Sequence, residues 1–139
     1  MTPEQVQLVQ RTWSRIAPDK AGAGMLFYDR LFTQHPELQP MFKGDRRTQA
    51  LKLMNMVEVA VNALDDLGAV VPDVEAMGRR HLNYGVEPEH YAQVGAVLLW
   101  TLQQGLGEEY TPEVEGAWTT VYGVLADTMQ RGAYENIPG

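Results

Sequence analysis

Residues 26–42, LFYDRLFTQHPELQPMF, have the pattern of a helix that ends at a proline. Apolar side chains recur at helical spacing as far as Phe32, and the residue before Pro36 is sterically disfavoured in the helical conformation. A short helical turn is expected to follow, from Pro36 to Met41 or Phe42, before a loop. The stretch therefore predicts two helical segments joined by a bend.

The same helical spacing continues on both sides of this stretch. Thr2, Pro3 and Gln5 match a capping box, in which the threonine and glutamine side chains satisfy the first backbone groups of a helix. Helices are expected from there to about Ile16, from near Arg46 to before Asp65, from Pro72 to no further than Gly85, from Pro88 to about Gly105, and from Pro112 through Met129. No run of strictly alternating residues is bounded by turn residues, so the chain is predicted to be all-α.

Length and composition exclude several classes of protein. The 139 residues carry 11 Lys and Arg against 18 Asp and Glu, a net charge of −7, and no cysteine. Disulfides, zinc-thiolate sites and cysteine nucleophiles are therefore excluded, and the acidic balance argues against nucleic-acid binding. Neither a secretory signal nor a membrane span is found, so a cytoplasmic location is expected. One domain is expected over residues 2–131, with a loosely ordered tail at residues 132–139.

The three histidines differ in their surroundings. His81 alone falls on the apolar face of a predicted short helix, one turn after Met77. His35, beside a proline, is interpreted as a loop residue, and His90, in the first turn of its helix, as a surface residue. His81 is therefore the candidate ligand for a metal or haem iron, although a hydrogen-bonded core histidine is the commoner explanation of such spacing. No Ser-His-Asp, phosphate-loop or His-Glu-x-x-His pattern occurs, so hydrolase chemistry has no visible residues.

Two polar side chains are predicted to enter the apolar interior. Tyr28 lies in the middle of its helix, and Gln49 extends by one turn the apolar stripe of the long helix. That stripe consists of Leu53, Met56, Val57, Ala60 and Leu64. The small residues Gly24 and Ala50 allow the two helices to cross closely, which would direct Tyr28 and Gln49 into one space. Each side chain needs a partner there, which is either the other one, a further protein group, water or a ligand.

Four stretches in the same order resemble the globin family. They are LFYDRLFTQHPELQPMF at residues 26–42, GRRH at 78–81, PEHYAQVG at 88–95 and AWTTVYGVLAD at 117–127. The spacing of Tyr28, Phe42, Gln49, Leu53, His81 and Tyr91 is similar to that in bacterial single-domain globins and in the globin domain of flavohaemoglobins. The resemblance covers residues 2–131 and implies a globin fold, with seven to eight helices around a haem pocket.

The resemblance also implies a cofactor and its contacts. The cofactor would be haem b, with His81 as the proximal iron ligand. The implied haem contacts are Phe42 on the porphyrin face, Leu53 above the iron, and Met77, Val86 and Val94 in the apolar slot. Arg80 and Lys52 are implied partners of the haem propionates, or else plain surface residues. Tyr28 would donate a hydrogen bond to bound O2, with Gln49 as a second donor.

The proximal side departs from the flavohaemoglobin pattern. In that pattern Tyr91 lies beside the iron ligand and acts with a glutamate of the last helix to make the imidazole a stronger electron donor. The matching position here is Ala133, and Glu135 would substitute only if the tail folds back. The departure calls a strongly activated, peroxidase-like proximal side into question.

The implied function is reversible binding of O2, CO or NO, with conversion of NO and O2 to nitrate. Since the sequence ends at Gly139 without a flavin or nicotinamide domain, the electrons are expected from a separate reductase. A monomer or weak homo-oligomer is expected. Two alternatives stay open. One is a sensor or O2-binding protein without turnover, in which Gln49, Tyr28 or water takes the sixth iron position. The other is a haem-free helical interaction domain, which would be colourless.

Overall fold

The computed structural model describes residues 2–42, 44–66, 68, 71–76, 78 and 88–134. Within these residues every regular element is helical and no strand is present, which confirms the predicted all-α class. None of the described helices is both long and apolar enough to cross a membrane.

Five α-helices have defined ends in the described part of the chain. They are α1 (Pro3–Ile16), α2 (Lys20–Gln34), α3 (Arg46–Asn62), α5 (Pro88–Leu106) and α6 (Pro112–Tyr134). The 3₁₀ segments between them are η1 (Ala17–Asp19), η2 (Pro36–Met41), η3 (Leu64–Asp66) and η4 (Gly107–Glu109). Residues 71–76 form a further helical stretch, here called the 71–76 helix.

The helix ends follow local signals in the sequence. The Thr2 hydroxyl accepts a hydrogen bond from the Gln5 backbone at 3.1 Å, and the Gln5 side chain accepts one from the Thr2 backbone at 3.0 Å, which confirms the capping box. The Asp45 carboxylate caps α3 by accepting a hydrogen bond from the Thr48 backbone at 3.0 Å. Such caps satisfy backbone N–H groups that have no partner inside the helix.

Two features differ from the sequence prediction. The described part of the chain contains five α-helices and the 71–76 helix, fewer than the seven to eight that the resemblance implies. The short helical turn expected from Pro36 to Met41 is present as the 3₁₀ segment η2, which contains Pro40. A proline inside a helical turn removes a backbone donor, which limits the turn to a short segment. In addition, α6 continues to Tyr134, which lies three residues inside the predicted tail.

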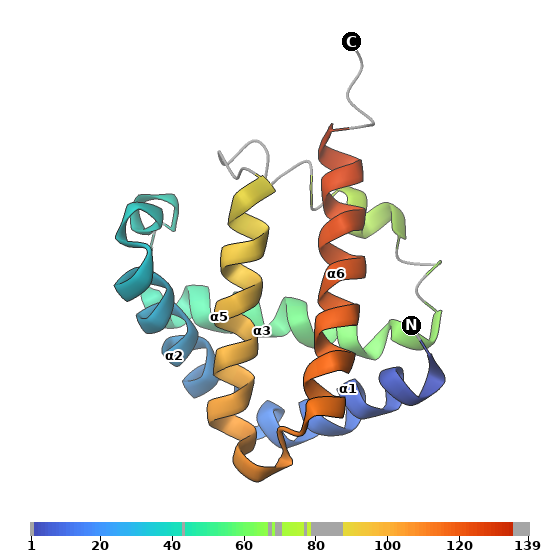
Figure 1. The fold of residues 1–139 in the computed structure, drawn as a ribbon. Coiled ribbons are helices and arrows are strands. Elements are labelled where there is room, and N and C mark those ends of the chain that lie inside the picture. Colours follow the sequence, from blue (N-terminus) through green and yellow to red (C-terminus); the bar gives the residue numbers. More distant parts are fainter. Residues whose placement is uncertain are drawn as a thin grey trace.

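The helices are arranged so that α3 faces a pair formed by α5 and α6. In Figure 1, α5 and α6 run side by side in opposite directions, and α3 crosses behind them. α2 packs closely against α3 and α5, whereas α1 packs mainly against α6. The contacts of α3 with α2 are far more extensive than those with α5 or α6. The space between α3 and the α5 and α6 pair holds the cavity described below.

The protein core anchors α1 to α6 through two tryptophans. The Trp118 indole donates a hydrogen bond to the Thr12 hydroxyl at 2.9 Å, and both residues are buried. The Trp13 ring lies with its centroid 6.4 Å from that of Trp118. Among the fully buried side chains around them are Val9, Phe27, Leu31, Val97, Leu102 and Val121. A buried indole N–H with a satisfied partner adds a directional contact to this apolar packing.

α2 and α3 touch at the two small residues that the sequence singled out. A Cβ atom added to Gly24 would lie 2.7 Å from both the Cβ and the carbonyl oxygen of Ala50. The two backbones therefore approach more closely at this crossing than any larger residue at position 24 permits, as predicted.

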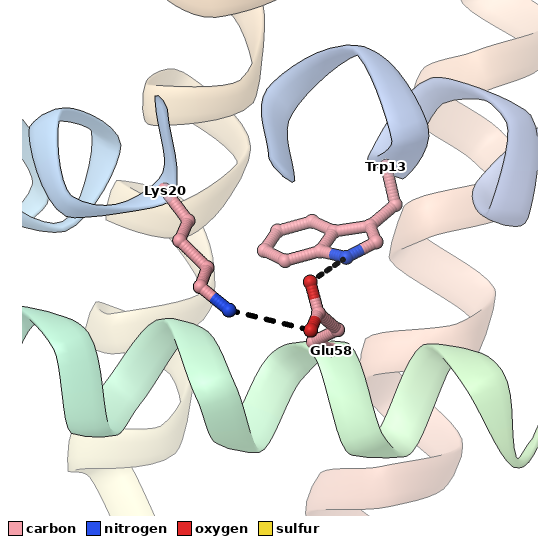
Figure 2. A network of polar contacts seen from close by, with 3 residues as sticks. All are labelled: Trp13, Lys20 and Glu58. Atoms are coloured by element: carbon pink, nitrogen blue, oxygen red, sulfur yellow. Dashed lines mark hydrogen bonds and ion pairs between the residues drawn. The ribbon is translucent and has the colours of Figure 1, made fainter. Parts of the chain in front are cut away.

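A polar contact ties the second half of α3 to the first two helices. Figure 2 shows the Glu58 carboxylate of α3 between Trp13 of α1 and Lys20 of α2. One carboxylate oxygen accepts a hydrogen bond from the Trp13 indole at 3.2 Å, and the other lies 3.3 Å from the Lys20 ammonium. Since the Lys20 and Glu58 side chains are about one-third exposed, this ion pair is partly shielded from water.

Candidate functional site

A cavity of about 210 Å³ lies between α3 and the α5 and α6 pair. Phe27 of α2, Leu38 of η2, Phe42 and Val74 of the 71–76 helix are among the residues that line it. Its walls include Leu53, Met56, Val57 and Ala60 of α3, Tyr91 and Val94 of α5, and Tyr122, Leu125 and Met129 of α6. The lining is almost entirely apolar and the cavity is partly open to solvent.

α3 presents one apolar face to the protein core and another to the cavity. Its buried residues are Ala50, Met54 and Val61. Of the stripe predicted from the sequence, Leu53, Met56, Val57 and Ala60 lie along the cavity, and 37% of Met56 is exposed. Leu64, the fifth predicted member, lies in η3 and is buried in the core. Covering apolar side chains of this kind stabilises the protein by about 25 cal/mol per Å² of apolar surface removed from water. The stripe is therefore placed to contact a bound apolar group.

Tyr28 is buried behind the cavity wall in a cluster of aromatic rings. Its ring centroid lies 5.1 Å from that of Phe27, 5.2 Å from that of Phe42 and 5.6 Å from that of Phe32. Phe27 and Phe42 both line the cavity. Only 3% of Tyr28 is exposed, and its hydroxyl forms no hydrogen bond to another described residue. Burial raises the pKa of Tyr28 to about 12, so the phenol stays a hydrogen-bond donor at neutral pH.

Gln49 has a different environment. It lies on α3 one turn before Leu53, but it is not among the described residues that line the cavity. Its amide nitrogen lies 3.8 Å from the position of a Cβ atom on Gly44, so the side chain extends toward the loop before α3. The meeting of Tyr28 and Gln49 in one space stays a prediction.

Tyr91 and Tyr122 join α5 to α6 on the opposite wall of the cavity. The Tyr122 hydroxyl donates a hydrogen bond to the Tyr91 backbone carbonyl at 2.5 Å. A Cβ atom on Gly95 would lie 2.5 Å from the Tyr122 ring, so the glycine leaves room for the ring against α5. Burial, together with the neighbouring Tyr91, raises the pKa of Tyr122. Tyr122 was not recognised as a site residue from the sequence, because its spacing is also that of a core residue of the last helix.

His90 is not the surface residue that the sequence suggested. It is partly buried and lines the cavity at the start of α5, one turn before Val94. The interpretation as a surface residue rested on its position in the first turn of a helix. That position says nothing about which side of the turn faces a cavity, so the prediction was wrong.

The other predicted site residues fall into three groups. Phe42, Leu53, Tyr91 and Val94 line the cavity. Lys52 is an exposed residue of α3, and Ala133 falls within α6. Met77, Arg80, His81, Val86 and Glu135 lie outside the described residues.

The cavity has the features that a large flat apolar cofactor requires. Apolar side chains from α3 and from α6, such as Val57 and Leu125, line the space. The partial opening gives polar edge groups of a bound molecule access to water. A neutral phenol, Tyr28, lies directly behind one wall. The residues present therefore fit a haem group.

The sequence matches a family model and several known proteins. The family model described as Globin matches residues 26–129. A flavohemoprotein of Bacillus subtilis (strain 168) is 39% identical over 115 residues, and the match covers 78% of this chain but only 29% of the flavohemoprotein. Neuroglobins of Tetraodon nigroviridis and Danio rerio are 29% and 31% identical, over 94% and 90% of their own lengths.

A solved structure has the same fold as this chain. It is the crystal structure of a hexacoordinated heme protein from an anhydrobiotic tardigrade at pH 4, with a TM-score of 0.86. The match covers 96% of this chain and 95% of that one. Because the two sequences are only 18% identical, the similarity establishes the fold alone.

Proposed function

The chain belongs to the globin family, and from this premise we propose that it binds haem b in the cavity between α3 and the α5 and α6 pair. The observation that carries the proposal is the apolar cavity with the partly exposed stripe of α3 on its wall. When bound, the haem supplies an iron atom with a free coordination position for O2, CO or NO.

The residues that hold the haem are assigned from the lining and the family pattern. Phe42, Leu53 and Val94 line the cavity and would pack against the macrocycle. Met77 and Val86 are proposed for the same apolar slot, and His81 for the iron. The propionate partners are proposed to be Arg80 and Lys52, since the Lys52 side chain is exposed on α3 and long enough to reach a carboxylate at the edge of the cavity.

Tyr28 is proposed to hold the gas by donating a hydrogen bond. Its pKa of about 12 keeps the proton on the phenol, and its ring is fixed by Phe27, Phe32 and Phe42. A hydrogen bond to a charged acceptor is worth about 1.5 to 3 kcal/mol. A phenol donor at Tyr28 would favour O2 over CO, because bound O2 would carry more negative charge than bound CO and would accept the stronger hydrogen bond. Gln49 is proposed as a second donor, which requires its side chain to turn from the Gly44 loop.

The imidazole of His81, the proposed iron ligand, is proposed to be only a moderate electron donor. Tyr91 and Tyr122 are held together by a hydrogen bond that uses the Tyr122 proton and the Tyr91 carbonyl. At the position where flavohaemoglobins have a glutamate, this chain has Ala133. The imidazole of His81 then lacks that carboxylate partner unless Glu135 provides one.

The catalytic proposal is nitric oxide dioxygenation with an external electron donor. One O2, one NO and one electron give one nitrate ion, and the electron comes from a separate reductase. The apolar lining excludes water, and Tyr28 orients O2 toward the incoming NO. The similarity to a flavohemoprotein, 39% identical over 115 residues, supports this proposal. We place the protein in the cytoplasm, as a monomer or weak homo-oligomer.

The absorption spectrum of the reduced, gas-free protein tests the haem proposal and separates the alternatives. A five-coordinate spectrum is expected for gas chemistry. A six-coordinate spectrum would favour the sensor or the O2-binding protein without turnover. A colourless protein that takes up no added haem would favour a helical interaction domain and would overturn the haem proposal.

Rapid mixing of the O2-loaded protein with NO tests the catalytic proposal. Nitrate is expected to form faster than O2 and NO react in free solution, because both gases meet in a confined apolar site. A rate equal to that in free solution would leave gas binding as the function and would end the dioxygenase proposal.

A further inference from the structure

The aromatic cluster around Tyr28 carries a cation on its outer side. The Phe32 ring stacks on the Tyr28 ring, with centroids 5.6 Å apart and planes inclined by 24°. The Arg46 guanidinium, from the first turn of α3, lies over the Phe32 ring at 5.4 Å from its centroid. A guanidinium within about 6 Å of a ring centroid is attracted to the face of the ring. A half-exposed cation, a partly exposed ring and a buried phenol therefore follow one another inward.

An ion pair holds Arg46 in this place. Its Nη1 donates a hydrogen bond to Oδ1 of Asp29 at 2.6 Å, and Asp29 directly follows Tyr28 in α2. The pair is 40% and 57% exposed, and ion pairs so exposed contribute little to stability. A positive charge in the first turn of a helix is also unfavourable for the helix itself. Arg46 is therefore better explained by the ring that it covers than by the stability of α3.

Of the three rings around Tyr28, Phe32 is the one with room to move. Phe27 and Phe42 meet the Tyr28 ring edge to face, at interplanar angles of 82° and 65°, so the stacked contact is that of Phe32. Phe27 is 1% exposed and packed in the core, whereas Phe32 is partly exposed. Without a cover Phe32 could turn toward solvent, which would free one face of the Tyr28 ring. The cation over Phe32 opposes that motion.

We propose that Arg46 is a positioning residue for the Tyr28 hydroxyl: paired with Asp29, it keeps Phe32 against the Tyr28 ring and so fixes the direction in which the phenol donates its hydrogen bond. This inference rests on the proposed role of Tyr28 as the donor to bound O2. Hydrogen bonds weaken steeply as they depart from linearity, so a small rotation of the ring changes how tightly the gas is held. Arg46 is not among the described residues that line the cavity, and it acts on the gas through Tyr28.

The first test observes the Tyr28 ring by NMR of the whole chain with 13C-labelled tyrosine, in the reduced, CO-loaded protein or, if no haem is bound, in the haem-free chain. The Tyr28 signal is the one that Tyr28→Phe removes. Arg46→Gln keeps much of the side-chain stem and removes the planar cation. It should shift the Tyr28 signal more than that of any other of the six tyrosines, because the field of the stacked Phe32 ring changes.

Arg30→Gln is the matched control. Arg30 also belongs to α2, and its guanidinium lies 4.7 Å from the centroid of the Trp100 ring on α5. The substitution therefore removes the same charge and the same kind of contact, but at a ring outside the aromatic cluster of Tyr28. The Tyr28 signal should stay at its wild-type position.

The second test measures O2 release in a double-mutant cycle, which separates positioning from general damage. Arg46→Gln should release O2 about twofold to fivefold faster than the wild type, a smaller effect than loss of the hydroxyl itself. In the Tyr28→Phe background the same substitution should change nothing further, because no hydroxyl is left to position. Arg30→Gln should release O2 at the wild-type rate in the Tyr28 background.

The outcomes distinguish this proposal from the proposed function. A Tyr28 signal that Arg46→Gln leaves in place, an unchanged rate of O2 release, or an equal acceleration with and without the Tyr28 hydroxyl would each overturn the role of Arg46 alone. If Tyr28→Phe itself releases O2 at the wild-type rate, the donor role of Tyr28 is wrong and this proposal fails with it. A chain that takes up no haem would overturn both proposals, whatever the NMR signal does.

Discussion

At the scale of single residues, Tyr28 combines an apolar environment with a hydroxyl group that can donate a hydrogen bond. Three phenylalanine rings within 5.6 Å hold its ring in place, and its hydroxyl bonds to no other described residue. The sequence predicted that Tyr28 enters the interior, and its 3% exposure confirms this. Buried polar groups are normally paired, so this hydroxyl is the group that a ligand would use.

The Tyr28→Phe variant is expected to release O2 at least tenfold faster than the wild type. The change removes one hydrogen-bond donor and keeps the ring, and a tenfold effect corresponds to about 1.4 kcal/mol. Stopped-flow displacement of O2 by CO measures the rate. Tyr110→Phe, which changes a tyrosine outside the cavity lining, should release O2 at the wild-type rate. Equal rates for Tyr28→Phe and the wild type would transfer the donor role to Gln49.

Tyr28 should also make the haem-free protein sensitive to alkali. Its pKa is 10.0 in the unfolded chain and about 12 in the folded one, so the folded state holds the proton more tightly. Stability is then complete below pH 10 and is lost as the pH rises from about 10 to about 12. The free energy of unfolding of the wild type relative to Tyr28→Phe should fall by about 2 kcal/mol between pH 9 and 11.5. Urea titrations at both pH values measure it, and a constant difference would contradict the burial of the phenol.

Several residues of the site could not be predicted from the sequence, for a common reason. Tyr122 binds a carbonyl 31 positions away in the chain, and His90 faces the cavity because of how α5 is rotated against its neighbours. Both facts depend on tertiary packing, which spacing along one helix does not report. Gln49 was predicted to point inward on spacing alone; its amide nitrogen lies 3.8 Å from where a Cβ atom on Gly44 would be, and its meeting with Tyr28 stays a prediction.

At the scale of elements, α3 shows what helical periodicity can and cannot predict. The periodicity correctly predicted a long helix, and four of the five residues of its predicted apolar stripe, Leu53, Met56, Val57 and Ala60, line the cavity. It did not tell whether the stripe faces the core or a ligand, because both require apolar side chains. The helix starts were predicted well since caps are local, as at Thr2 and Asp45. The end of α6 at Tyr134 carried no comparable signal.

The crossing of α2 and α3 gives a prediction for the fold. Gly24→Ala should lower the free energy of unfolding by about 1 to 3 kcal/mol, the usual effect of overpacking, because the new methyl group would lie 2.7 Å from the Ala50 carbonyl oxygen. Chemical denaturation measures the change. Gly116→Ala on α6 meets no atom within 4 Å and should be neutral or stabilising, since alanine favours the helix. A Gly24→Ala variant as stable as the wild type would mean that the two helices cross less closely.

At the scale of the whole molecule, hydrogen bonds and an ion pair join the helices on both sides of the cavity to one another. Trp118 joins α6 to α1, and Glu58 joins α3 to α1 and α2. The cavity lies between these elements, and most of the described side chains that line it are apolar. A ligand that binds only the folded state would stabilise the molecule by mass action, so haem is expected to serve the fold as well as the function.

The most direct test of the account is the absorption spectrum of the reduced, gas-free protein, recorded for the wild type and for His81→Ala. The wild type should show the Soret band of a five-coordinate haem, and His81→Ala should lose or shift that band together with its affinity for O2. A His81→Ala protein with the same Soret band and the same O2 affinity as the wild type would contradict the account.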